Sequence, residues 1–229
     1  MTGPDGGGPS ERLPYRVLLA DDHPLTCRGL AWLLEQEPDI RVCGEAAAQQ
    51  RILTAIEDLH PDLVVLGLSF QWGSGLELLK KIRARHPHLS VLILSMHDER
   101  LFAERALRAG AQGYATKLQP PSEVIHAVRT VLSGGIYLNP SMAAHMVRQF
   151  VAGGPAVSTS PLGALSDREL EVFELLGRGR STRQIADELH LSIKTIETYR
   201  AHIIAKLNLA GSAELLHQAI QWVQTGGHC

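Results

Sequence analysis

Through residue 135, short apolar runs alternate with longer segments whose apolar residues recur every three or four positions. The repeated change of period predicts βαβ units and a parallel sheet whose central strands are buried on both faces. The runs expected to form strands are residues 16–20, 41–44, 62–68, 90–94 and 113–116. Such a five-stranded sheet should be doubly wound and flavodoxin-like, with its ligand site at the carboxyl ends of the strands.

Helical periodicity separates the expected strands and then takes over the rest of the chain. Helices are expected at residues 25–35, 50–59, 75–85, 99–109, 122–132 and 140–151, and then at 167–176, 182–189, 193–207 and 213–224. Residues 152–164 are rich in Gly, Pro, Ser and Thr, which is typical of a flexible linker. We therefore expect a disordered tail (1–14), an α/β domain (15–135), a helix with linker (136–164) and an all-α domain (165–229).

Composition narrows the class of protein without naming a partner. The chain of 229 residues carries 22 basic and 24 acidic side chains, so its total charge does not indicate a nucleic-acid binder. Its 3 cysteines form no CxxC pair and its histidines are scattered, which favours a reducing cytoplasm and argues against a metal site. No apolar stretch approaches the ~18 residues of a membrane span, so we expect no membrane partner.

Polar residues cluster where the expected strands end. Asp21 and Asp22 follow the first strand, Gly67 lies in the third, Ser95 ends the fourth and Lys117 ends the fifth. These positions converge in a doubly wound sheet. Two adjacent carboxylates suit Mg²⁺, and a hydroxyl with an ammonium group suits a phosphoryl group. Capping roles for the acids and the serine, with a surface lysine, are the alternative for each residue taken singly.

Three motifs in this order resemble a response-regulator receiver domain over about residues 15–135: VLLADDHPLTCRGL, LILSMHDE and GAQGYATKLQPPSEV. The resemblance implies phosphoryl transfer from a histidine kinase to an aspartate at the end of the third strand. Gly67 occupies that position, and Gln71 replaces the usual proline. A laboratory substitution could have introduced Gly67, although Gln71 favours natural divergence.

Glycine offers no nucleophile, so the pocket resembles a degenerate receiver that forms no aspartyl phosphate. Mg²⁺ binding should be weak or absent, and we expect no cofactor. We expect no activating base to adjoin Ser69, which makes it a poor substitute nucleophile. The retained Asp21, Asp22, Ser95 and Lys117 could instead form a salt-bridged cluster that holds the loops.

Tyr114 lies three residues before Lys117, where the family places its switch aromatic; a half-buried tyrosine at the sheet edge is the alternative. Without phosphate, a small ligand, a protein partner or a fixed active-like state would have to set the switch.

The C-terminal third of the sequence contains residues that are typical of helix N-termini. Ser166 with Glu169, and Ser181 with Gln184, have the spacing of capping boxes, and Ser192 is a good N-cap. The tight turn between the second and third helices makes a helix-turn-helix candidate. In the third helix, a buried side is expected to hold Ile196, Tyr199, Ile203 and Leu207, with Lys194, Thr198, Ala201 and Ala205 opposite.

Residues 164–220 are similar to the DNA-binding domain of the NarL/FixJ/LuxR regulators, through S-x-R-E-x-E-V, G-x-S-x-x-Q-I-A and S-x-K-T-I-E. The resemblance implies that the third helix enters the major groove of double-stranded DNA. It places Glu197, Thr198 and Ala201 at the bases, and Lys194, Thr195 and Arg183 at phosphates, which set register. This sequence has Tyr199 where the family commonly has a histidine, and Ser212 where an arginine is frequent. Arg200 and Lys206 would contact phosphates or pair with Glu171 and Glu174.

Charge in this region is segregated, because residues 175–210 carry six basic and only three acidic side chains. We therefore expect a cytoplasmic, phosphorylation-independent, sequence-specific transcriptional regulator that binds as a homodimer. The alternative is a protein-interaction module that titrates a partner and binds DNA weakly or not at all. An enzyme such as a phosphohydrolase of the haloacid dehalogenase type is disfavoured, because D-D replaces the D-x-D that it requires.

Overall fold

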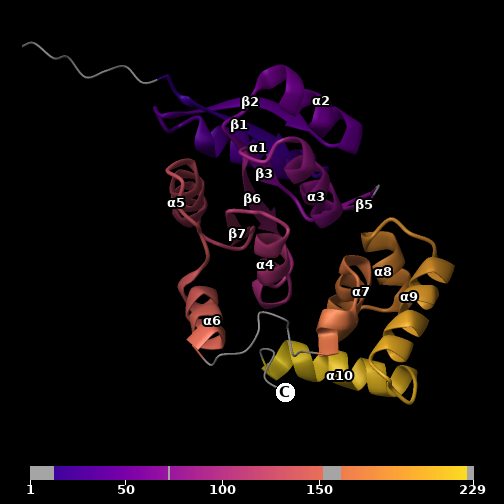
Figure 1. Ribbon diagram of the computed structural model, residues 1–229. Helices are drawn as coiled ribbons and strands as arrows, with labels where there is room; N and C mark the ends of the chain where they lie inside the picture. Colours follow the sequence, from indigo (N-terminus) through magenta and orange to yellow (C-terminus); the bar gives the residue numbers. More distant parts are fainter. Residues whose placement is uncertain (1–12, 72, 152–160, 226–229) are drawn as a thin grey trace, which may run out of the picture.

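The computed structural model describes residues 13–71, 73–151 and 161–225 (Figure 1). Its first part is the expected five-stranded parallel sheet, in the order β2-β1-β3-β6-β7. The strands are β1 (Tyr15–Ala20), β2 (Ile40–Ala46), β3 (Leu63–Leu66), β6 (Ser90–Ser95) and β7 (Gly113–Thr116). The helices are α1 (Pro24–Leu34), α2 (Gln49–Leu59), α3 (Gly75–Arg85), α4 (Glu99–Arg108) and α5 (Pro121–Leu132). The doubly wound fold class is confirmed.

Side chains alternate between the two faces of the sheet, so each face builds its own apolar core. Val17 and Leu19 pack with α1 and α5, whereas Leu18 and Ala20 pack with α2, α3 and α4. All four are at most 1% exposed, as expected for a central strand covered on both sides. The ends of β1, β3 and β6 consequently open toward one edge, where the polar residues lie.

A short antiparallel hairpin after β3 was not expected. The strand expected over residues 62–68 stops at Leu66, and β4 (Ser69–Phe70) then pairs with β5 (Gly73–Ser74). Two-residue strands are too short to show a period. A Cβ atom on Gly75 would lie 2.1 Å from the Gly67 carbonyl oxygen, so only glycine lets the chain return so closely at the start of α3. Ser69 therefore lies on the first strand of this hairpin and not on β3.

The second part is helical, with α6 (Pro140–Val151), the 3₁₀ turn η1 (Pro161–Ala164), α7 (Asp167–Gly177), α8 (Thr182–Glu188), α9 (Ile193–Lys206) and α10 (Ser212–Thr225). Both capping boxes and the Ser192 N-cap are present as expected. Ile196 and Ile203 are fully buried on the expected side of α9. The tail through residue 12 and the linker residues 152–160 lie outside the described residues. In the part of the chain that is described, no helix has the length and apolar character to traverse a bilayer.

The two parts pack against each other through α7, which faces α4 and the ends of the strands, while α9 lies on the far side (Figure 1). One apolar cluster runs continuously from Phe102 and Tyr114 through Leu162 and Leu165 to the core of the helical part. Arg105 on α4 donates to the carbonyl oxygens of Leu165 and Leu162 at 2.8 and 2.7 Å. The helical part is thus docked by a defined face.

Close packing of α7 on α10 predicts the effect of a single methyl group. A Cβ atom on Gly177 would lie 2.4 Å from the Ala219 carbonyl oxygen. Gly177→Ala should therefore lower the free energy of unfolding by about 1–3 kcal/mol, despite the better helix propensity of alanine. Gly211→Ala is the control, because nothing lies within 4 Å of the position of its Cβ atom. Urea titration followed by circular dichroism measures both; equal stabilities would contradict this packing.

Candidate functional site

Asp21, at the end of β1, makes side-chain contacts with two residues. Lys117 Nζ lies 2.5 Å from Asp21 Oδ2, and the ring and backbone nitrogens of His23 both lie 2.9 Å from Asp21 Oδ1. Asp21 is only 9% exposed. Both of its oxygens are therefore already bonded to nitrogen groups.

Asp22 points toward the hairpin instead. Its Oδ2 accepts a hydrogen bond from the Gln71 backbone at 2.6 Å. Its buried Oδ1 has no hydrogen-bond partner among the described residues, although the ring nitrogen Nδ1 of His23 lies 3.1 Å away. Asp21, Asp22 and His23 bring their ligand atoms close enough to hold a metal ion. Mg²⁺ prefers several oxygen ligands in octahedral geometry. With only the Asp22 Oδ1 oxygen lacking a hydrogen-bond partner and a histidine as third ligand, this arrangement fits Mg²⁺ poorly.

Gly67 lies where β3 ends, directly beside the Asp21–Lys117 pair. A Cβ atom at position 67 would be 2.7 Å from Asp21 Oδ2. Any larger residue would therefore require Asp21 to move. The structure brings Asp21, Gly67 and Lys117 together, whereas Ser95 turns elsewhere: its Oγ accepts a hydrogen bond from the His97 backbone at 3.1 Å.

Tyr114 is fully buried rather than half-buried at the sheet edge. Its hydroxyl donates to the His97 carbonyl oxygen at 3.0 Å, and burial raises its pKa well above the ordinary value. The aromatic ring is therefore held in an inward position. Ser95, expected in the pocket, and Tyr114, expected as the switch aromatic, both bond the backbone of His97.

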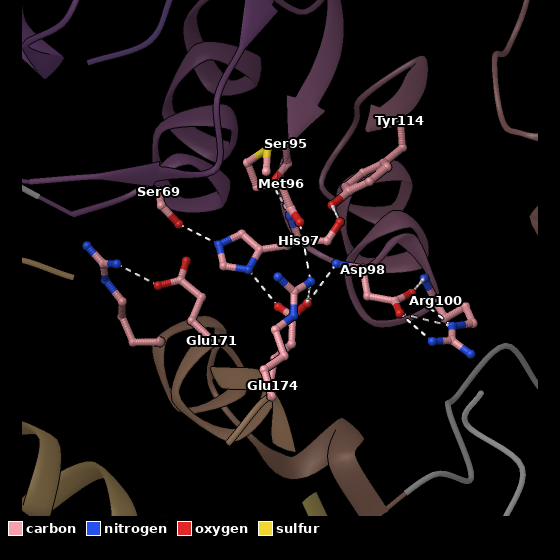
Figure 2. Close-up of polar contacts among 11 residues, drawn as sticks. Ser69, Ser95, Met96, His97, Asp98, Arg100, Tyr114, Glu171 and Glu174 are labelled. Atoms are coloured by element: carbon pink, nitrogen blue, oxygen red, sulfur yellow. Dashed lines mark hydrogen bonds and ion pairs between the residues drawn. The ribbon is translucent and has the colours of Figure 1, made fainter. Parts of the chain in front are cut away.

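His97 joins the two parts of the molecule (Figure 2). Its Nε2 lies 2.6 Å from Ser69 Oγ, and its Nδ1 lies 2.6 Å from Glu174 Oε2 on α7. The expectation that no activating base adjoins Ser69 is therefore wrong: the base comes from a loop 28 residues away in sequence. Ser69, His97 and Glu174 form a hydroxyl–imidazole–carboxylate series.

Glu174 has no solvent exposure and is bonded on both oxygens. Its Oε1 accepts from the Asp98 backbone at 2.9 Å and from Arg178 Nη2 at 2.6 Å. Burial lowers the pKa of His97, but the hydrogen bond and charge of Glu174 outweigh burial and hold that pKa above its ordinary value. The charged groups at this interface are therefore paired, as buried ions must be.

A second buried acid, Glu171, lies beside this pair on α7. Arg168 Nη1 lies 2.5 Å from Glu171 Oε2, and Arg168 Nη2 donates to the Phe70 carbonyl oxygen at 3.0 Å. Burial raises the pKa of Glu171 although Arg168 opposes the rise. Neither Glu171 nor Glu174 pairs with Arg200 or Lys206, so that expected alternative is wrong.

The residues expected to read DNA lie on the outer side of α8 and α9. Arg183, Lys194, Glu197, Thr198 and Ala201 are exposed, and Thr195 and Arg200 are partly exposed. Arg200 Nη1 donates to Thr182 Oγ1 at 2.6 Å, and Lys206 Nζ lies 2.6 Å from Glu169 Oε2. These contacts hold two of the cations against the scaffold, and the remaining residues present an uncovered helix face.

Comparison with known proteins matches both parts of the chain. Residues 17–129 match the response regulator receiver domain, and residues 163–219 match the bacterial regulatory proteins of the luxR family. The oxygen regulatory protein NreC of Staphylococcus carnosus is 36% identical over 210 residues, which cover 90% of this chain and 97% of NreC. The chain belongs to the LuxR-family response regulators.

Solved structures support the same assignment of this response regulator. RcsB from Salmonella enterica serovar Typhimurium, bound to promoter P1flhDC in the presence of phosphomimetic BeF3-, is similar with a TM-score of 0.60 and 26% identity, over 90% of this chain and 98% of RcsB. A structure of two RcsB dimers bound to two parallel DNAs is similar with a TM-score of 0.55 and 25% identity, over 89% of this chain and 97% of the RcsB chain.

Sequence reasoning missed His97 and Glu174, and it misjudged Ser69. His97 follows Ser95 in the quoted LSMHDE motif, so its closeness to the pocket was visible. Its partner is 77 residues away on another domain, and no local pattern reveals such a contact.

The raised pKa of His97 makes docking depend on pH. The protonated imidazole stabilises the folded state fully below its unfolded pKa near 6.5, and this contribution is lost as pH rises through the raised folded pKa. The unfolding midpoint of the wild type should therefore exceed that of His97→Gln at about pH 6, and the difference should shrink toward about pH 9. Differential scanning calorimetry measures both proteins. A difference that is constant with pH would contradict the assigned role.

Proposed function

We propose that this response regulator binds promoter DNA sequence-specifically through α9, as a homodimer, without requiring aspartyl phosphorylation. The observation that carries the proposal is the docking of the receiver on α7, which leaves the reading residues of α9 exposed. A helix whose outer face carries Lys194, Thr198 and Ala201 presents a narrow surface suited to the major groove. The receiver in this arrangement does not cover that surface.

The pocket gives the second line of support. Gly67 offers no acceptor oxygen, and Lys117 pairs with Asp21 within the space that a larger residue would need. A receiver of this composition would hold its switch groups without phosphate, since Ser95 and Tyr114 already bond the His97 backbone. We assign it to the degenerate receivers, acting as a regulator rather than as an enzyme.

The relatives supply the third line. RcsB binds promoters and forms dimers on DNA, and NreC is named as a regulatory protein. The basic segment between residues 175 and 210 provides the matching electrostatic surface. The competing role, a module that titrates a partner, would leave that surface without a nucleic-acid ligand.

Lys194→Ala and Thr198→Ala distinguish a residue that contacts the DNA phosphates from a residue that contacts the bases. The lysine substitution should weaken binding to all sequences alike and lower the slope of log affinity against log salt by about 1. The threonine substitution should change the ranking of sequences and keep the slope. Genome-wide binding of the protein first identifies DNA fragments that it occupies. Fluorescence anisotropy on these fragments at two salt concentrations then measures the affinity of each variant and its salt dependence. The control is Ser141→Ala, on exposed α6 and remote from α9. The proposal fails if wild-type protein forms no specific complex at low salt.

The wild type should take up no stable label from ³²P-acetyl phosphate or from a histidine kinase, because position 67 has no carboxylate. A receiver domain that carries an aspartate at the end of its third strand, treated in parallel, serves as the positive control for the donor. Gel filtration first removes the free label. The label that survives acid and the label that hydroxylamine releases from the protein are then measured separately. Hydroxylamine-sensitive label on the wild-type receiver would show that an acyl phosphate forms and would overturn phosphorylation independence.

A further inference from the structure

Ser69 has the surroundings of an activated serine rather than of a surface hydroxyl. It is partly exposed on β4, and its Oγ lies 2.6 Å from the Nε2 atom of a buried imidazole. A hydroxyl is a weak nucleophile until a base within hydrogen-bond distance takes its proton. His97 occupies that position (Figure 2).

The orientation of His97 is fixed by its other nitrogen. Glu174 Oε2 accepts from Nδ1 at 2.6 Å, and the carboxylate is itself held by the Asp98 backbone and Arg178. A carboxylate at Nδ1 keeps the proton on that nitrogen and leaves Nε2 as the acceptor for a hydroxyl proton. The three side chains come from β4, from the loop after β6 and from α7, so the series exists only when the two domains are docked.

The charges around Ser69 favour a neutral substrate. When His97 is neutral, as the base must be, Glu171 is paired with Arg168 and Glu174 with Arg178, so each of these arginines in the described interface is matched by an acid. A phosphoryl dianion would find no unmatched positive charge there, and the two carboxylates would repel it. An uncharged carboxylic ester meets no such penalty.

We propose that Ser69 is an activated nucleophile that becomes acylated by small neutral activated esters, with His97 as the base and Glu174 as the positioning residue. Ser69 Oγ attacks the carbonyl carbon and forms a new C–O bond, while its proton passes to His97 Nε2. The bond between the carbonyl carbon and the leaving alkoxide breaks, and the proton leaves with that group or passes to solvent. The products are acyl-Ser69 and an alcohol.

The full-length protein is treated with 4-nitrophenyl acetate, and nitrophenolate release and the acetylated peptides are followed over time. The wild type should release nitrophenolate in a burst stoichiometric with protein, with acetyl on Ser69. Ser69→Ala should abolish the burst. Ser133 is the internal control, since its hydroxyl is exposed and donates only to the Thr130 carbonyl oxygen.

Glu174→Gln tests the positioning role, because it keeps the size of the side chain and removes the charge. It should slow acylation of Ser69 by about a hundredfold or more. Glu171→Gln is the matched control, since it removes an equally buried acid on the same helix that is paired with Arg168 rather than with His97. It should slow acylation far less than Glu174→Gln does, because Glu171 acts on His97 only through its charge and forms no hydrogen bond with it.

The pH dependence separates positioning from a purely structural role. The charged groups facing His97 are Glu174, Glu171 and Arg178 from α7 and the adjacent Asp98, and Ser69 faces it from β4. The rate at which the wild type is acylated should rise with pH as the His97 imidazole loses its proton. The pH midpoint of this rise should be lower in Glu174→Gln, which lacks the carboxylate charge. The proposal is overturned if the Ser69 peptide stays unmodified, or if Glu174→Gln acylates as fast as the wild type.

Discussion

Glu174 buries its carboxylate completely between two domains and meets donors from both of them: His97 and the Asp98 backbone on one side, Arg178 on the other. Taking such a charge out of water is unfavourable unless every lone pair is used, and removing one partner of a buried pair costs about 3–5 kcal/mol. The arrangement therefore tolerates little sliding of α7 over the receiver. The orientation of α9, which follows from α7, depends on the same carboxylate.

The same contact is connected to the pocket at the strand ends through one backbone segment. Ser95 bonds the His97 nitrogen and Tyr114 bonds its carbonyl oxygen, so the loop after β6 is fixed from both ends. Ser95 and Tyr114 thus both bond His97, the residue that contacts Glu174 on α7. The domain arrangement and the pocket are therefore linked through this series of hydrogen bonds.

Much of the fold follows from local signals in the sequence. The alternation of periods gives the parallel sheet, and Ser166 and Ser181 mark helix starts within a residue because a capping box satisfies backbone donors of its own first turn. The exposed face of α9 also follows from its period. The hairpin at Ser69 does not, since two-residue strands carry no pattern. The contact between His97 and Glu174 could not be inferred either, because it depends on how two separately patterned domains pack. Ser69 shows the consequence: judged by its neighbours in sequence it lacks a base, and in the folded chain it has one.

Acylation of Ser69 would act on more than the serine itself. An acylated oxygen no longer has a proton to donate to His97 Nε2, so the imidazole would lose one of its two side-chain hydrogen bonds while Glu174 retains the other. At equilibrium the coupling is reciprocal, so a change in the docking equilibrium on acylation implies an equal change in the acylation equilibrium on docking. Undocking would remove Glu174 from His97 and return Ser69 to the reactivity of an ordinary hydroxyl. DNA that selects one domain arrangement would therefore change the reactivity of Ser69, although the reading helix and the serine lie on opposite sides of α7.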